Sequence, residues 1–441
     1  MRLIALFLLV PIIGYSQFES LSSGPMVGHA SAREVKIWLQ TDGSAEVKIH
    51  YWMQERKDKK FWQSKMEMTH RENAYTTTIT LDSVVANTEY HYQVYLNNQP
   101  IELERRLSFK TPPIWSKGQS PPEFSLAFGS CSFVNDSTID TELKGGDYHI
   151  FQSIADKRPD LMFWLGDNVY LRPEDWSSDT GFKYRYTYDR KLPEMAELLS
   201  SVSNYAIWDD HDFGPNDSDR SFIRKERALY WFNQFWANPT AGLAGYGLPS
   251  TQGIVSFFTW GDVDFFLTDN RYFRTPQKRI TGNKSIFGEA QLEWLLDALK
   301  FSEANVKVVL MGNLFLSSSS YYKNQNFISN YNEERAYLLS RLEQEGVRNL
   351  IILSGDKHFS ELSKYEDANR NPIYEFTSSP LTAHVNGRPD PNTFRIHGSH
   401  IRQRNFGMIQ FSMDEMSQRR CVLSLYDADG QVLFEHNILI K

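Results

Sequence analysis

Residues 161–170 read Leu-Met-Phe-Trp-Leu-Gly-Asp-Asn-Val-Tyr, an apolar run of five that stops at Gly166-Asp167. A short run of this kind is typical of a strand buried on both faces, as in the parallel sheet of an α/β protein. Almost wholly apolar runs also occur at 124–128, 205–208, 263–267, 306–311 and 350–353. Helical periodicity lies between them, at 289–304 and 332–346 among others, and three short strands are expected after residue 405. The pattern predicts an α/β domain with central, mostly parallel or mixed sheets.

Each apolar run stops at residues that can bind a metal or a phosphate. The six endings are GSC at 129–131, GDNVY at 166–170, WDDHD at 208–212, DNR at 269–271, GN at 312–313 and GDKH at 355–358. Ligands of α/β sheets bind beyond the carboxyl ends of the strands, so these side chains are expected to share one site. Carboxylates, imidazole, a thiolate and a phenolate from separate strands suit a mixed dinuclear centre better than a closed structural zinc site.

The first hundred residues have a different pattern. Short alternating strands are predicted at 35–39, 45–51, 75–81, 90–95 and 107–110, with turn signals at Asp42-Gly43 and Asn97-Asn98. We interpret residues 17–112 as a small all-β sandwich similar to a fibronectin type III domain, residues 113–122 as a proline-bracketed linker, and residues 123–441 as the catalytic domain. No cluster of metal ligands falls in the first of these, which favours a spacer or supporting role.

Residues 1–16 are typical of an export signal. Met1-Arg2 is a basic start, residues 3–13 are apolar, and Gly14-Tyr15-Ser16 resembles a cleavage site. The apolar run is too short to span a bilayer, and no later segment approaches eighteen apolar residues, so no transmembrane anchor is expected. The sequence therefore predicts a protein that is exported to the periplasm or secreted.

Charge and cysteine content exclude several classes of protein. The 441 residues carry 54 acidic and 47 basic side chains, a net charge of −7, which argues against a general nucleic-acid-binding surface. Phosphate chemistry is not excluded, because a bound metal supplies local positive charge. Two cysteines, Cys131 and Cys421, cannot form a disulfide framework, although one bridge between them is an alternative to a metal-binding Cys131.

The ordered set GSC, GDxxY, WDDHD, DNRYFR and GDKH resembles the alkaline phosphatase D (PhoD-like) family of calcineurin-like metallophosphoesterases. The resemblance covers residues from about 120 to 400, and that family commonly carries a small β-sandwich before its catalytic domain. It implies a layered sandwich of the metallophosphoesterase type and an enzyme that hydrolyses phosphoric mono- or diesters. The family's third motif usually ends in Glu, whereas here it ends in Asp212.

The resemblance also implies roles for individual residues. Asp167 would bridge two metals, and His211 would contact the leaving group. The further metal ligands implied are Cys131 and Tyr170 for a ferric ion, Asp210 and Asn216 for a second ion, and Asp356 and His358 to complete the shell. Iron with calcium is the pair that the family suggests, with another divalent metal as an alternative; oxygen-rich Asp210 and Asn216 would suit Ca²⁺.

The mechanism that we hypothesise is attack of a metal-bound hydroxide on a phosphate ester, with protonation of the leaving alkoxide by His211. Arg271 or Arg274 would bind a phosphate oxygen, because the guanidinium fork matches phosphate geometry. The alternatives that remain open are a structural role for His211, packing for Tyr170, and ion pairs of Arg271 and Arg274 with Asp269.

Two other functions are compatible with the pattern. One is a phosphodiesterase for lipid headgroups or wall polymers, which the motifs do not separate from an enzyme for small phosphate esters. The other is a non-catalytic binding protein on the same fold with a decayed metal site. That alternative predicts gaps in the ligand set, and the set is complete.

Overall fold

The computed structural model describes residues 20–55, 61–239, 242–246, 252–319, 327–387 and 390–440. The export signal predicted at residues 1–16 lies outside these residues. None of the helices in the described part of the chain has both the length and the apolar character needed to cross a bilayer.

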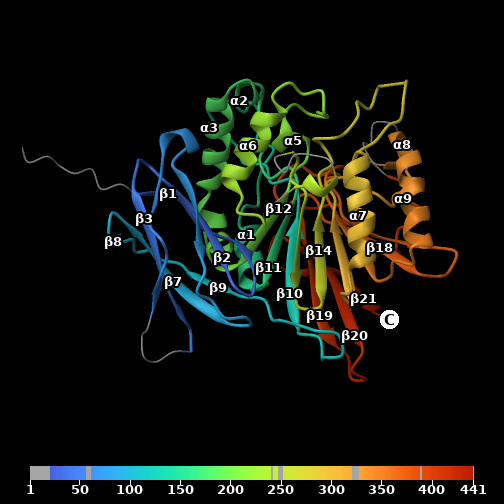
Figure 1. Ribbon diagram of the computed structural model, residues 1–441. Coiled ribbons are helices and arrows are strands. Elements are labelled where there is room, and N and C mark those ends of the chain that lie inside the picture. Colours follow the sequence, from blue (N-terminus) through green and yellow to red (C-terminus); the bar gives the residue numbers. More distant parts are fainter. Residues whose placement is uncertain are drawn as a thin grey trace, which may run out of the picture.

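Two six-stranded mixed sheets form the centre of the molecule (Figure 1). The order of the first is β12 (Ser203–Ile207), β11 (Leu161–Leu165), β10 (Phe124–Gly129), β19 (Asn405–Met413), β20 (Arg419–Asp427) and β21 (Val432–Leu439). The order of the second is β13 (Ser256–Trp260), β14 (Val263–Leu267), β15 (Val306–Leu310), β16 (Leu350–Ser354), β18 (Pro372–Thr377) and β17 (Glu361–Glu366). Strands β10 to β12 are mutually parallel, as are β14, β15, β16 and β18.

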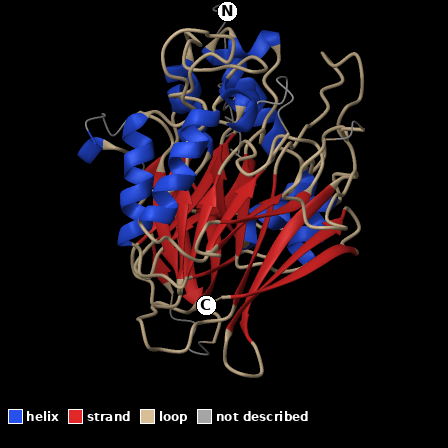
Figure 2. Cartoon of the chain, turned by 90° about the vertical axis from the view of Figure 1, so that its right-hand side faces the viewer, coloured by secondary structure: helices blue, strands red, loops and turns tan. Residues whose placement is uncertain are grey.

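The two sheets pack face to face, and helices cover their outer faces (Figure 2). Phe163 of β11 contacts Phe265 of β14 with ring centroids 5.0 Å apart, and Phe128 contacts Phe376 at 5.1 Å. The helices are α1 (Ile150–Asp156), α2 (Pro173–Trp176), α3 (Asp179–Arg190), α4 (Ala196–Ser201), α5 (Asp210–Phe213), α6 (Lys225–Phe235), α7 (Glu289–Phe301), α8 (Phe327–Asn330) and α9 (Asn332–Gln344). The layered α/β sandwich that the resemblance implies is confirmed, and both sheets are mixed, because β13, β17 and β19 to β21 are antiparallel to their neighbours.

The N-terminal region is all β, as predicted. One sheet has the order β1 (Leu21–Ala30), β2 (Val35–Thr41) and β6 (Thr76–Leu81). The other contains β3 (Glu46–Met53), β4 (Trp62–Gln63), β5 (Glu67–Met68), β7 (Glu89–Leu96), β8 (Gln99–Pro100) and β9 (Ser108–Lys110). The predicted strands all have counterparts here, and β1 and the two-residue strands β4, β5 and β8 are additional.

The N-terminal sheets pack directly on the α/β region and share its hydrophobic core. The Trp38 indole N–H donates to the carbonyl of Gln234 at 2.7 Å, and the Tyr92 hydroxyl donates to the carbonyl of Ser200 at 2.8 Å. Gly28 of β1 approaches Ala237 so closely that a Cβ at residue 28 would lie 2.4 Å from the Ala237 methyl group. The N-terminal region thus contacts α4 and α6 of the α/β region, while its supporting role stays a prediction.

Candidate metal centre

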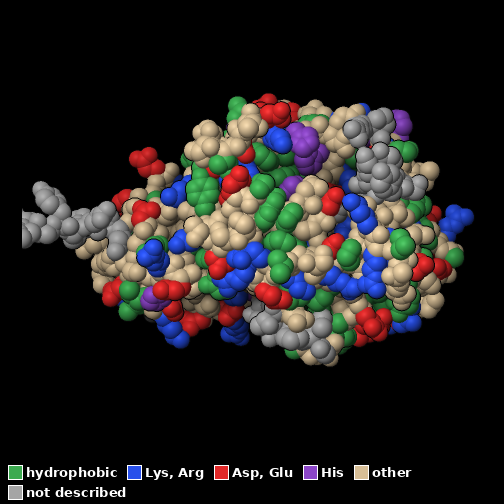
Figure 3. Space-filling view, turned by 90° about the horizontal axis from the view of Figure 1, so that it is seen from above, with side chains coloured by type: hydrophobic (Ala, Val, Ile, Leu, Met, Phe, Trp, Pro, Cys, Tyr) green, Lys and Arg blue, Asp and Glu red, His purple; other side chains and the backbone are tan. Residues whose placement is uncertain are grey.

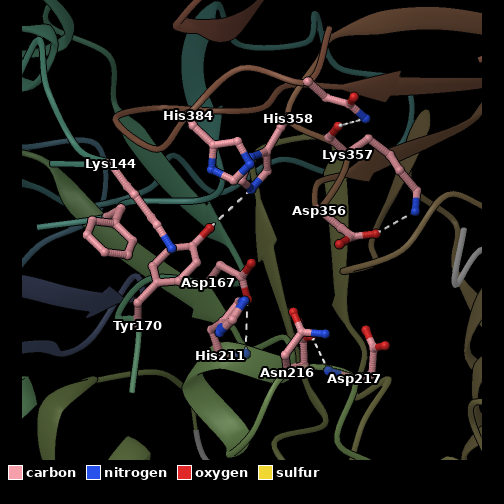
Figure 4. A pocket seen from close by; sticks show the side chains of 13 residues that line it. Lys144, Asp167, Tyr170, His211, Asn216, Asp217, Asp356, Lys357, His358 and His384 are labelled. Carbon is pink, nitrogen blue, oxygen red and sulfur yellow. Dashed lines mark hydrogen bonds and ion pairs between the residues drawn. The ribbon is translucent and has the colours of Figure 1, made fainter. Parts of the chain in front are cut away.

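Loops that follow the carboxyl ends of strands in both sheets meet around one cavity of about 390 Å³. Cys131 follows β10, Asp167 follows β11, Asp210 begins α5 after β12, and Asp356 follows β16. The lining consists of Phe133, Lys144, Asp167, Tyr170, Asp210, His211, Asn216, Asp217, Asp356, Lys357, His358, His384 and Asn386 (Figure 4). Parallel strands point these loops in one direction, and the packed sheets bring the two sets together.

Four residues of the proposed ligand set have left-handed backbone conformations. The φ angles are +60° at Cys131, +51° at Asp167, +71° at Asp356 and +56° at His358. For residues other than glycine such conformations cost about 1–3 kcal/mol each and persist only where the surroundings enforce them. Here the loops hold one another, because the Cys131 amide donates to the carbonyl of Gly166 at 3.2 Å and the Ser132 amide to that of Asp167 at 2.8 Å.

A first group of donors consists of Cys131, Asp167 and His358. One donor atom from each lies within 4.8 Å of the others, and Cys131 Sγ is 3.6 Å from Asp167 Oδ2. The Tyr170 hydroxyl lies 3.2 Å from His358 Nε2, which brings a phenol oxygen to the same place. The thiol also accepts from the Ser379 hydroxyl at 3.3 Å. Thiol, phenol, imidazole and carboxylate are therefore assembled on one side of the cavity.

Carboxylates dominate the neighbouring groups. Asp167, Asp210 and His211 bring donor atoms within 4.8 Å of one another, as do Asp209, Asp210 and Asp356. Asp167 thus belongs both to the group around Cys131 and to a group around Asp210. The Asp217 amide donates to Asp210 Oδ2 at 2.7 Å, while Asp210 Oδ1 is buried and accepts no hydrogen bond from the described residues. Its neighbour on that side is Arg271 Nη2 at 3.5 Å.

Burial without a cation makes the charged forms of these donors unfavourable. Desolvation raises the pKa of the Cys131 thiol to about 12. Desolvation, followed by the charges of Asp210 and Cys131, raises the pKa of Asp167, and desolvation also raises the pKa of Tyr170. A bound cation reverses this balance, because it stabilises the deprotonated ligand and releases its proton. The donor set therefore fits a site for metal ions.

His211 lines the cavity beside Asp167 and Asp210. Its ring packs on Tyr170 with centroids 4.3 Å apart, and its backbone amide donates to Asp167 Oδ1 at 3.2 Å. Burial lowers the pKa of the imidazole. The imidazole is part of the cavity lining, where it can reach a ligand (Figure 4).

Arg271 and Arg274 do not line this cavity, although both follow β14. Arg271 is fully buried, and its Nε donates to Asp209 Oδ1 at 2.5 Å. Arg274 is also buried, and its Nη1 donates to Asn313 Oδ1 at 2.7 Å. The side chain of Asp269 instead accepts from the Trp208 indole at 2.8 Å. The arrangement supports neither substrate contact by the two arginines nor pairing with Asp269: they connect the loops behind the cavity.

The cations that do line the cavity are Lys144 and Lys357. Lys144 lies beside Tyr170 on one wall, and Lys357 lies on the opposite wall with Nζ 2.7 Å from Asp356 Oδ2 (Figure 4). His384 also lines the cavity and packs edge-on against His358 at 4.4 Å. Lys357 is visible in the GDKH motif, but Lys144 lies in the long loop between β10 and α1 and belongs to none of the motifs.

Asp212, which ends the third motif, does not line the cavity. Asp212 is buried; its Oδ1 accepts from the Asn168 amide at 2.9 Å and its Oδ2 accepts from the Asp209 amide at 2.9 Å. It therefore joins the loops after β11 and β12, away from the cavity lining.

Cys131 and Cys421 are both free thiols, so the alternative of a disulfide is not realised.

Known proteins share both the sequence pattern and the fold. A family model described as PhoD-like phosphatase matches residues 126–418, and a model for a domain of unknown function matches residues 18–114. Alkaline phosphatase D of Bacillus subtilis (strain 168) is 21% identical over 420 residues, covering 83% of this chain and 68% of that protein. A solved structure titled "Structure of PhoD" superposes with a TM-score of 0.74 at 17% identity, covering 93% of this chain and 91% of that one. The first match spans more than half of the sequence, and the chain therefore belongs to the PhoD-like phosphatase family of phosphoester hydrolases.

Proposed function

We propose that the cavity holds two metal ions and that the protein is an exported hydrolase of phosphoric mono- or diesters. The observation that carries the proposal is the position of Asp167, which belongs to two donor groups at once. A carboxylate shared in this way can bridge two cations. The ligands proposed are Cys131, Asp167, Tyr170, Asp210, Asn216, Asp356 and His358.

The chemistry of the donors favours iron with calcium. A thiolate and a phenolate beside His358 suit a transition metal such as Fe³⁺, whereas the carboxylates and the Asn216 amide oxygen suit a hard ion such as Ca²⁺. Another divalent metal in either position would be compatible with the same residues. When bound, the two ions would supply Lewis acidity to activate water and to neutralise charge on the phosphoryl group.

The side chains of the cavity would then position the substrate and move a proton. Lys144 and Lys357 line different sides of the cavity, where they can hold phosphate oxygens as point charges (Figure 4). His211 is placed to donate a proton to the departing alkoxide, a step typically worth about 10²–10⁴-fold in rate. Arg271 would act at one remove, by fixing Asp209 and Asp210 through its ion pairs.

The decisive variant is Asp167→Asn, which keeps the size of the side chain but removes the bridging charge. We expect loss of bound metal by elemental analysis and a fall of at least about 10³-fold in hydrolysis of 4-nitrophenyl phosphate and its bis-ester. The matched control is Asp264→Asn, a buried carboxylate in β14 that binds the hydroxyls of Thr259 and Ser302. Full activity of Asp167→Asn, or a metal-free and inactive wild type, would end the proposal; the second result would favour the binding-protein alternative.

Export is proposed from residues 1–16 and is tested separately. Expressed from its full gene, the protein should be recovered outside the cytoplasm with Gln17 as its first residue, which N-terminal sequencing would show. Recovery of the intact N-terminus in the cytoplasm would contradict this part of the proposal and leave the hydrolase assignment unchanged.

A further inference from the structure

Three loops each expose an aliphatic side chain beside a basic one. The exposed fractions are 78% for Leu143, 93% for Ile223 and 96% for Ile280. Leu143 precedes Lys144, Ile223 precedes Arg224-Lys225, and Ile280 follows Lys278-Arg279. A single exposed aliphatic side chain is common, but several on one face can mark a site of contact with a partner or a membrane.

The three loops share the edge of the molecule that holds the cavity. They follow β10, β12 and β14, and the carboxyl ends of these strands all face the candidate metal centre. In Figure 1 the green segment between β12 and α6 and the yellow segment between β14 and α7 stand at the upper edge of the sheets. Seen from above, this face shows histidine side chains with hydrophobic, basic and acidic side chains nearby (Figure 3).

Basic residues predominate in the stretches around Ile223 and Ile280, although the chain is acidic overall. Residues 218–227 contain four basic and two acidic side chains, and residues 276–284 contain three basic and none acidic, in a chain of net charge −7. Arg224 and Arg227 share Asp179, with nitrogen–oxygen distances of 3.2 and 2.8 Å. Arg220, Lys278 and Arg279 make no ion pair within the described residues, so their charge faces outward.

We propose that this face, defined by Leu143, Ile223 and Ile280 with the neighbouring cations, docks on an anionic lipid surface. Aliphatic tips can enter the boundary between headgroups and acyl chains while Lys and Arg contact anionic headgroups. A soluble polyanion would explain the cations but would leave the aliphatic tips uncovered. Docking would place the mouth of the cavity against the membrane; this orientation is independent of whether the cavity binds the metals and substrates proposed above.

The test is co-sedimentation of the whole protein with vesicles of phosphatidylcholine alone and with added phosphatidylglycerol. We expect binding to the anionic vesicles only, and a loss of at least about tenfold in affinity for the double variant Ile223→Ser/Ile280→Ser. Hydrolysis of a soluble ester should not change in this variant, because neither residue lines the cavity. The matched control is Phe301→Ser, which replaces an 88% exposed apolar side chain. Phe301 ends α7, just before the start of β15, and not in a loop at the carboxyl end of a strand.

A second variant examines the charges. Lys278→Gln/Arg279→Gln should remove the preference for anionic vesicles and leave hydrolysis of the soluble ester intact. Absence of vesicle binding by the wild type would overturn the proposal. The proposal would also be overturned if salt and the charge variant both abolish vesicle binding while the aliphatic variant leaves it unchanged. That result would indicate a soluble polyanion instead. A protein that binds vesicles but hydrolyses no ester would contradict only the proposed function.

Discussion

The Tyr170 hydroxyl lies 3.2 Å from Nε2 of His358, although the two residues are 188 positions apart in the chain. Tyr170 follows a strand of the first sheet and His358 follows a strand of the second, so this contact joins the two sheets at the cavity. The phenol ring is also held by Phe133, at a centroid distance of 4.9 Å, and by His211 at 4.3 Å. The ring is thus fixed by packing, while the oxygen is available to a metal.

This separation of roles makes Tyr170→Phe informative. The ring contacts should persist and only the oxygen donor is lost, so we expect metal affinity and kcat to fall at least about tenfold with little change in Tm. Titration with metal followed by elemental analysis measures the first effect. Tyr186→Phe is the control, because its buried hydroxyl has no hydrogen-bond partner within the described residues. Unchanged metal content in Tyr170→Phe would leave Tyr170 as a packing residue.

His211→Asn should affect esters according to their leaving groups. An alkyl phosphate needs a proton on its departing oxygen, so kcat should fall about 10²–10⁴-fold. Nitrophenolate leaves without protonation, and its release should slow by less than about tenfold. The measurement is the ratio of the two rates in variant and wild type, with His436→Asn on β21 as the control. Equal losses for both esters would show that His211 is structural or a metal ligand.

Much of the architecture could be predicted because strong local patterns decide it. An apolar run such as 161–165 has no stable place except between other layers, and Gly166-Asp167 marks where it leaves the sheet. Strand β1 was not predicted, because residues 21–30 include Gly24-Pro25 and lack clean alternation. That strand forms because it pairs with β2 and packs on the α/β region, contacts that the local sequence does not encode.

Only part of the candidate site could be predicted from the sequence. Strand ends indicate which residues meet at the edge of a sheet, but they do not indicate where each side chain points. Arg271 turns inward because Asp209, 62 positions away, offers a buried carboxylate. Lys144 reaches the cavity from a long loop whose path depends on tertiary contacts, such as the hydrogen bond from the Gly145 amide to the side chain of Asn135 at 2.8 Å.

Arg271→Met separates the structural role of this arginine from the role expected from the sequence. Removing the guanidinium leaves Asp209 and Asp210 buried without their cation, and breaking a buried pair in this way typically costs about 3–5 kcal/mol. We expect a clear fall in Tm. If Arg271 only bound substrate, its replacement would raise KM and leave Tm unchanged. Arg220→Met, at an exposed arginine that makes no ion pair in the described chain, is the control.

Asp209→Asn in the Arg271→Met background gives a second comparison. It removes one of the two buried carboxylate charges that the loss of Arg271 leaves unpaired. Part of the lost stability should therefore return, seen as a higher Tm than in Arg271→Met alone. The two substitutions should therefore be less than additive, as residues in direct contact are expected to be. Strict additivity would contradict the direct pairing of Arg271 with Asp209.

The contact between the N-terminal sheets and the α/β region should weaken in mild acid because of His29. Burial, and secondarily the charge of Lys36, lowers the pKa of this imidazole from 6.5 to about 4. A histidine whose pKa is lower in the folded state stabilises the fold fully above pH 6.5, and this contribution is lost as the pH falls from 6.5 to 4. The difference corresponds to about 3 kcal/mol.

His29→Phe should remove this dependence, because phenylalanine can keep the aromatic contacts with Tyr205 and Phe258 and does not titrate. Denaturant unfolding of both proteins between pH 7.5 and 4 would show the wild type losing stability relative to the variant as the pH falls. His70→Phe, at an exposed histidine, controls for an added aromatic group. If the difference in unfolding free energy between wild type and His29→Phe stays constant across this range, His29 is not protonated on unfolding, and the acid sensitivity of the junction lies elsewhere.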